Sequence, residues 1–141
     1  MSAFLTYEGT TDYLAVTPAM VITLAASGSI IAGRAVVVES TNPGYCYMPT
    51  SAPSGSLIPA GVATATVSDG DPLGVIVWGY VKSLPSLPAT GTVRFGQPLV
   101  ITGSGYWGTS GSTKVAQVAG KTVSGSAGYT YAFINCMDNV A

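Results

Sequence analysis

The sequence predicts an all-β domain, either a small β-sandwich or a β-barrel. Short runs of β-branched and aromatic residues recur along the chain, each bounded by Gly, Pro, Ser or Asn-Pro. No stretch of a dozen residues combines apolar positions at helical spacing with an N-cap and good helix formers. With 141 residues, the chain is long enough to bury one hydrophobic core without disulfide staples.

The predicted strands follow these runs, and two of them are expected in the middle of a sheet. Residues 73–82 are apolar on both pleat faces, and Gly79 in their middle predicts a bulge or a close backbone approach. Residues 34–39, RAVVVE, carry charges only at their ends. The full set of predicted strands is 4–7, 19–24, 34–39, 45–47, 61–67, 73–82, 92–95, 98–102, 114–118 and 129–135.

The N-terminal segment, residues 1–28, differs from the remainder, which we interpret as a single β-rich domain over residues 29–141. The segment is either an extended arm or the first strand of the domain. An arm carrying Phe4, Leu5, Tyr7 and Tyr13 is suited to adding a strand to an exposed sheet edge elsewhere. Both interpretations are kept open.

The chain also contains a faint internal echo, which raises the hypothesis of a duplication of about residues 31–84 in residues 93–135. Three short matches occur in the same order in both parts. In each part, the third match is followed by an apolar strand. The matches are AGRAVVV (32–38) with FGQPLVI (95–101), GYCY (44–47) with GYWG (105–108), and TVSDG (66–70) with TVSGS (122–126).

The charge content is unusually low. Charged residues make up 8% of the chain and hydrophobic residues 48%, whereas roughly 25% charged residues are usual. The outer surface must therefore consist of hydroxyl groups, backbone and apolar patches, which favours packing against other protein. A net charge of −1 and five scattered basic residues argue against nucleic-acid binding, which needs a clustered basic face.

Cys46 and Cys136 are too few for a disulfide framework. They are either two buried thiols or one disulfide. Neither has a second Cys or a His nearby, so a zinc site is not expected.

Residues 13–33 contain no charge and are long enough to span a bilayer. Pro18, Gly28, Gly33 and several hydroxyl residues dilute this stretch, and no positive charge precedes it as a secretory signal requires. We therefore expect no membrane segment and synthesis in the cytoplasm.

The stretch that most resembles a site is DGDP, residues 69–72. Asp followed by Gly is ordinary turn chemistry, and Pro72 is suited to the start of a strand. A calcium loop would need a Glu at its twelfth position, where Tyr80 stands instead.

Without any His the chain has no Ser–His–Asp or Cys–His arrangement. We expect a protein that is not an enzyme and needs no cofactor, metal or small-molecule substrate.

Four aromatic residues, Tyr45, Tyr47, Tyr106 and Trp107, lie in Gly- and Pro-rich surroundings and are expected in loops. Such aromatic residues either pack within a loop or a subunit contact, or stack on sugar rings. Packing is the more common outcome, and sugar binding stays open as the alternative.

The run IIAGRAVVVE, followed after a variable loop by IPAGVATATVSDGDPLGVIVWGYVKSL, resembles the small head-decoration (cement) proteins of tailed bacteriophages of the lambda-like group. The features that carry the resemblance are a Gly-led apolar strand, a Gly-Val-Ala strand, and a strand that ends in Gly-x-Val. They correspond to Gly33 with residues 36–38, to residues 61–63, and to residues 79–81. The match covers a little over a third of the chain.

The resemblance implies a compact β-tulip-like domain and a homotrimer. Such a protein binds the major capsid protein on the outer surface of the virion, at three-fold and quasi-three-fold positions, and stabilises the shell. It also implies that an N-terminal arm with Phe4, Leu5, Tyr7 and Tyr13 contacts the capsid, and that there is no active site. The alternatives are another virion β-domain, such as a head-fibre or tail protein, and a carbohydrate- or host-surface-binding module.

Overall fold

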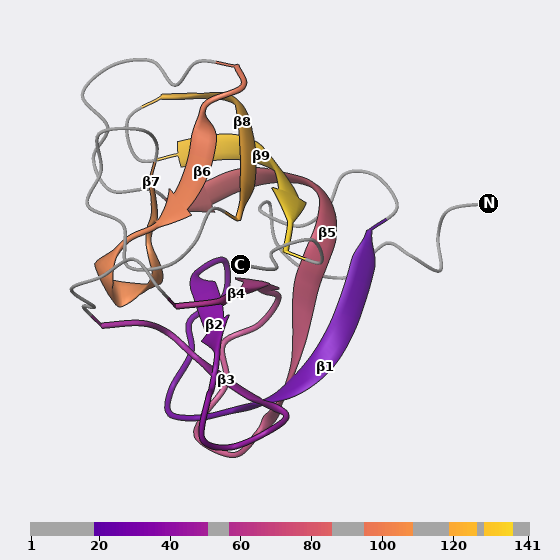
Figure 1. Ribbon diagram of the computed structural model, residues 1–141, viewed down its shortest axis with the longest axis vertical. Coiled ribbons are helices and arrows are strands. Elements are labelled where there is room, and N and C mark those ends of the chain that lie inside the picture. Colours follow the sequence, from indigo (N-terminus) through magenta and orange to yellow (C-terminus); the bar gives the residue numbers. More distant parts are fainter. Residues whose placement is uncertain (1–18, 51–56, 86–94, 109–118, 127–128, 137–141) are drawn as a thin grey trace.

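The computed structural model describes residues 19–50, 57–85, 95–108, 119–126 and 129–136. Within these ranges all regular elements are β-strands except one short 3-10 turn, η2 (Gly103–Gly105), so the all-β prediction is confirmed (Figure 1). The strands are β1 (Met20–Ala26), β2 (Ala35–Val38), β3 (Tyr45–Tyr47), β4 (Pro59–Ala63), β5 (Pro72–Pro85), β6 (Pro98–Ile101), β7 (Trp107–Gly108), β8 (Gly120–Ser126) and β9 (Tyr129–Asn135).

The first five strands form a closed barrel, which decides between the two architectures that the sequence left open. β1 pairs antiparallel with β5 along one edge and parallel with β3 at its end. The circle is completed by the antiparallel pairs β3–β2, β2–β4 and β4–β5. In Figure 1 this barrel occupies the lower half of the view.

β5 is the central strand, as predicted, and it extends beyond the barrel. Its first part pairs with β1 and β4, and from Trp78 onward it pairs with β9. The Asp-Pro start is confirmed, because β5 begins at Pro72. Gly79 has a φ of 134°, a conformation that side chains rarely adopt. The register of β5 shifts on both sides of it, between Ile76 and Trp78 against β1 and between Val81 and Leu84 against β9.

The second half of the chain repeats the pairing order of the first. In the barrel, neighbouring strands follow the order β1, β5, β4, β2 and β3. In the second half they follow the corresponding order β5, β9, β8, β6 and β7. The register repeats as well, since Val36 lies opposite Gly61 and Leu99 lies opposite Gly120. The residues aligned by the sequence echo, such as Val38 with Ile101, thus occupy equivalent positions. A duplication of the chain would produce this pattern and remains a prediction.

Other predicted strands shift or fall outside the described residues. The predicted strand 61–67 starts earlier and ends at Ala63, where the Thr64 hydroxyl donates to the Gly74 carbonyl at 2.7 Å. Phe95 lies in a turn instead of a strand. The glycine-containing β8 and the two-residue β7 were not predicted, because neither carries a β-branched run. The predicted strands 4–7 and 114–118 lie outside the described residues.

Two groups of buried side chains fill the molecule. The barrel cluster comes from the inward faces of all five barrel strands, and the bridging cluster joins the opposite faces of β2, β4 and β5 to the second half. The barrel cluster consists of Ala26, Ile30, Val36, Cys46, Ala60, Ala63, Leu73, Val75 and Val77. The bridging cluster consists of Ala19, Ala35, Val37, Val62, Ile76, Val81, Leu99, Ile101, Trp107, Ala119, Ala132 and Ile134.

Polar contacts reinforce the junction between the two halves. The buried indole of Trp107 donates to the Gly33 carbonyl at 2.9 Å. Arg34 donates to the Ser104 carbonyl at 2.8 Å and to the Tyr106 hydroxyl at 2.9 Å. The Arg34 guanidinium also lies 3.9 Å from the centre of the Tyr106 ring, a cation–π contact. The halves are therefore held by directional bonds as well as by apolar packing.

Gly61 and Gly120 permit the close approach of neighbouring strands, and we predict that neither tolerates alanine. An added Cβ would lie 2.1 Å from the Ile76 carbonyl oxygen at Gly61, and 2.1 Å from the Phe133 carbonyl oxygen at Gly120. Each substitution should lower the free energy of unfolding by about 2–4 kcal/mol, because backbone must move. Chemical denaturation measures this loss.

The matched control is Gly70→Ala, where φ is +85° but nothing lies within 4 Å of the added Cβ. Only backbone strain of about 1 kcal/mol is expected there. If Gly61→Ala cost no more than Gly70→Ala, the close approach would not limit these positions.

Candidate functional site

The two acidic side chains of the DGDP stretch serve a turn, as predicted. The Asp69 carboxylate accepts the Gly28 amide at 2.8 Å, and the Asp71 carboxylate accepts the Ser68 amide at 3.1 Å. Gly70 between them has a φ of 85°. Among the residues that the structure describes, no group of three or more Cys, Asp or Glu is placed to hold a metal ion.

Cys46 and Cys136 are free thiols and form no disulfide, and of the two thiols that were expected to be buried, Cys46 is buried and Cys136 is partly buried. Cys46 is buried in the barrel cluster, and the partly buried Cys136 packs against the bridging cluster. Burial raises the pKa of Cys46 to about 11 and that of Cys136 to about 12, because it disfavours the charged thiolate. Both are therefore protonated at neutral pH.

Tyr47, Tyr106 and Trp107 pack within the fold, whereas the partly exposed Tyr45 lines the groove described below. Tyr45 and Tyr47 belong to β3, and Trp107 belongs to β7, where a loop was expected. Trp107 is fully buried, and Tyr106 is held by Arg34. Trp107 therefore has no free ring face for a sugar, which removes the residue on which a sugar-binding module would most depend.

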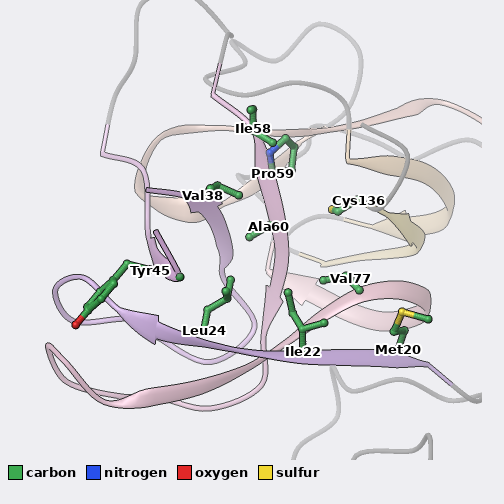
Figure 2. Close-up of a pocket in the computed structure, with 11 residues that line it drawn as sticks. Met20, Ile22, Leu24, Val38, Tyr45, Ile58, Pro59, Ala60, Val77 and Cys136 are labelled. Carbon is green, nitrogen blue, oxygen red and sulfur yellow. The ribbon is translucent and has the colours of Figure 1, made fainter. Parts of the chain in front are cut away.

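The most site-like feature is an apolar groove of about 300 Å³ at the side of the barrel, which we call the β1 groove (Figure 2). It lies between β1 on one side and β2 and β4 on the other, with β5 at its floor and Cys136 at one end. Its lining residues are Met20, Ile22, Leu24, Val38, Gly44, Tyr45, Ile58, Pro59, Ala60, Val77 and Cys136.

None of the described residues that line the β1 groove is charged, and several of them are exposed to solvent. Four large apolar side chains of its lining are exposed, at 44% for Met20, 40% for Ile22, 41% for Val38 and 48% for Ile58. Isolated exposed apolar residues are normal, but a contiguous group marks an interaction site. The groove is therefore the candidate functional site of the described residues.

The groove arises from strand pairing and from small side chains. β3 reaches only Ala25 and Ala26 of β1, so no described strand covers the earlier part of that edge. Met20, Ile22 and Leu24 alternate along β1 and line this opening.

The equivalent positions of the second half are filled. Val38 lies opposite Cys46 in the barrel, whereas Ile101 lies opposite Trp107 in the second half. Ile101 and Trp107 are both fully buried, while Val38 remains 41% exposed. The second half thus carries larger and fully buried side chains at the two positions that are equivalent to Val38 and Cys46.

Sequence reasoning missed the β1 groove. The signal was present as alternating apolar residues in the uncharged stretch 13–33, but a sequence does not show which apolar face remains uncovered. The predicted site residues Phe4, Leu5, Tyr7 and Tyr13 lie outside the described residues. In the part of the chain that is described, no helix has the length and apolar character to cross a membrane.

The thiol pKa values lead to a direct prediction. At pH 8, Cys46 in the folded chain should react with a maleimide at least about a hundredfold more slowly than in denaturant. A pKa of about 11 instead of 9.0 reduces the thiolate fraction by that factor, and burial of the side chain further restricts access of the reagent. The rate in the folded chain should keep rising with pH up to about 11. The Cys136→Ser variant leaves Cys46 as the only thiol for this measurement. Equal rates in the folded and denatured states would contradict the buried position of Cys46.

Comparisons with known proteins give an informative likeness to a solved structure. No family profile matches the sequence, and no curated protein matches it either. Among solved structures, the chain is similar to the N base of the head fibre protein gp8.5 of bacteriophage phi29, with a TM-score of 0.52 and 18% sequence identity. The likeness covers 82% of this chain and 93% of the phi29 chain. The two chains therefore share a fold over nearly their whole lengths.

Proposed function

We propose that this chain is a structural protein of a bacteriophage virion that binds the outside of the head. The observation that carries the proposal is the shared fold with a phage head-fibre base, which spans 93% of that chain. The decoration-protein resemblance of the sequence supports the same location. Of the residues that carry this resemblance, Gly33 lies in the turn before β2 and Gly61 lies within β4, and both strands belong to the barrel.

The surface chemistry is consistent with this role. A free soluble domain usually carries charges on about a quarter to a third of its surface residues, whereas charged residues make up only 8% of this chain. In an assembly, much of such a surface is covered by other protein. A contact of standard size buries about 1,600 Å² in total, and several subunits acting together bind by avidity.

Two finer roles are proposed within this function. A cement protein would bind the major capsid protein as a homotrimer at three-fold and quasi-three-fold positions, and stabilise the shell without catalysis or a cofactor. A head-fibre protein would use this chain as a base on the head. The phi29 likeness favours the second role, and the sequence resemblance favours the first.

The first test is co-sedimentation with purified heads, lacking this protein, of the phage that encodes it. The full chain should sediment with the heads and saturate at a fixed number of copies. A variant without residues 1–12 should remain folded by circular dichroism and bind more weakly, because it loses the arm that either contacts the head directly or links the subunits that attach together. No binding by the full chain to mature or immature heads would refute the proposed function.

The second test is the mass of the purified protein by light scattering. A homotrimer should show three times the 14.2 kDa mass of one chain. A mass equal to that of one chain at all concentrations would contradict a trimer that forms in solution. The chains would then assemble only on the capsid surface.

A further inference from the structure

We propose that the β1 groove binds residues 2–7 of a second copy of this chain as an added β-strand. The inference goes beyond the proposed function and does not depend on it, because the groove and the segment both belong to this chain.

The backbone of β1 offers a free edge at the groove. The Ala25 amide donates to the Gly44 carbonyl at 2.9 Å, so the backbone groups of Ala25 point toward β3. Because strand residues alternate, the backbone groups of Thr23 point to the same edge, where no described strand lies. An exposed edge of this kind pairs readily with an extended segment of another chain.

The size and chemistry of the groove fit an extended, uncharged segment. A volume of about 300 Å³ is at the lower end of ligand pockets, roughly 300–1,000 Å³, and accepts a few side chains rather than a folded surface. Residues 2–7, SAFLTY, carry no charge. In an extended segment, Leu5 and Tyr7 share one face and Phe4 lies on the other, so either face brings large apolar groups.

The position of Ala19 favours a second copy over the same chain as the donor. Ala19 is 2% exposed and packs in the bridging cluster rather than facing the groove. A segment returning to its own groove would have to reverse beside this packed residue. Residues 8–18 span at most about 40 Å when extended, a reach sufficient for a neighbouring subunit.

This contact has a consequence for the assembly. Because the donated segment and the receiving groove are different surfaces, two copies can exchange segments reciprocally as a dimer, or several copies can pass them head-to-tail around a ring. A ring of three chains would give the homotrimer of the proposed function, with each groove covered by the next chain.

Disulfide crosslinking between two singly substituted chains tests the proposal. All chains carry Cys136→Ser, because Cys136 is a native thiol in the groove lining. A Leu5→Cys chain, uniformly labelled with ¹⁵N, is mixed with an unlabelled Ile58→Cys chain and oxidised with diamide, which takes up the two hydrogens released as the S–S bond forms. A Phe4→Cys chain replaces Leu5→Cys in a parallel reaction, because the two residues face opposite sides. Mass spectrometry separates heterodimers from homodimers by the label. The control partner is Phe95→Cys, which is exposed at 74% and lies outside the groove.

We expect heterodimers with Ile58→Cys to form about a hundredfold faster than with Phe95→Cys for at least one arm variant, because a bound segment raises the local thiol concentration from micromolar to about millimolar. Equal yields with both partners would overturn the proposal. A single chain that carries both Leu5→Cys and Ile58→Cys tests the other donor. If it forms an internal disulfide while the mixture of single variants forms no heterodimers, the groove receives its own segment, and the proposal is overturned.

A second measurement does not require crosslinking. Ile58→Asp places a charge at the groove and should weaken self-association by about tenfold or more in analytical ultracentrifugation, because the charge loses water when the segment binds. Phe95→Asp is the matched control and should leave association unchanged. Loss of head binding with intact self-association would contradict only the proposed function, whereas unchanged self-association of Ile58→Asp would contradict this inference.

Discussion

The structure depends on β5, because this single strand belongs to both halves of the molecule. Its first part completes the barrel with β1 and β4, and its continuation from Trp78 provides the edge on which β9 pairs. Val75 and Val77 face the barrel cluster, while Ile76 belongs to the bridging cluster. Both faces of the strand are therefore used, which requires the nearly continuous apolar run that the sequence provides.

The repeated pairing order makes the differences between the halves informative. Gly61 and Gly120 lie at equivalent registers and have the same close approach to a carbonyl oxygen, so the backbone arrangement is shared. The side chains differ, since Trp107 fills the second half where Cys46 stands in the barrel. One backbone plan thus carries a buried Trp107 in the second half and an open apolar groove in the barrel, and this groove is suited to binding.

The proposed function and the groove inference address the same physical difficulty. A chain with so few charges and a group of exposed apolar side chains gains solubility when these surfaces are covered by protein. Attachment to a phage head would cover one part of the surface. Donation of residues 2–7 to a neighbouring groove would cover another, and it would link the subunits that attach together.

The sequence by itself determined the all-β class, the central place of residues 73–82 and the turn at Asp69 and Asp71, because each follows from local pattern: period-two apolar runs, and residues that favour turns. It also contained the echo whose aligned residues share equivalent registers. Only the tertiary structure decided that the strands close into a barrel, that Trp107 is buried and that the β1 groove is open. These features depend on which strand edges meet and how far each pairing extends, and such long-range contacts leave no signal in a local stretch of sequence.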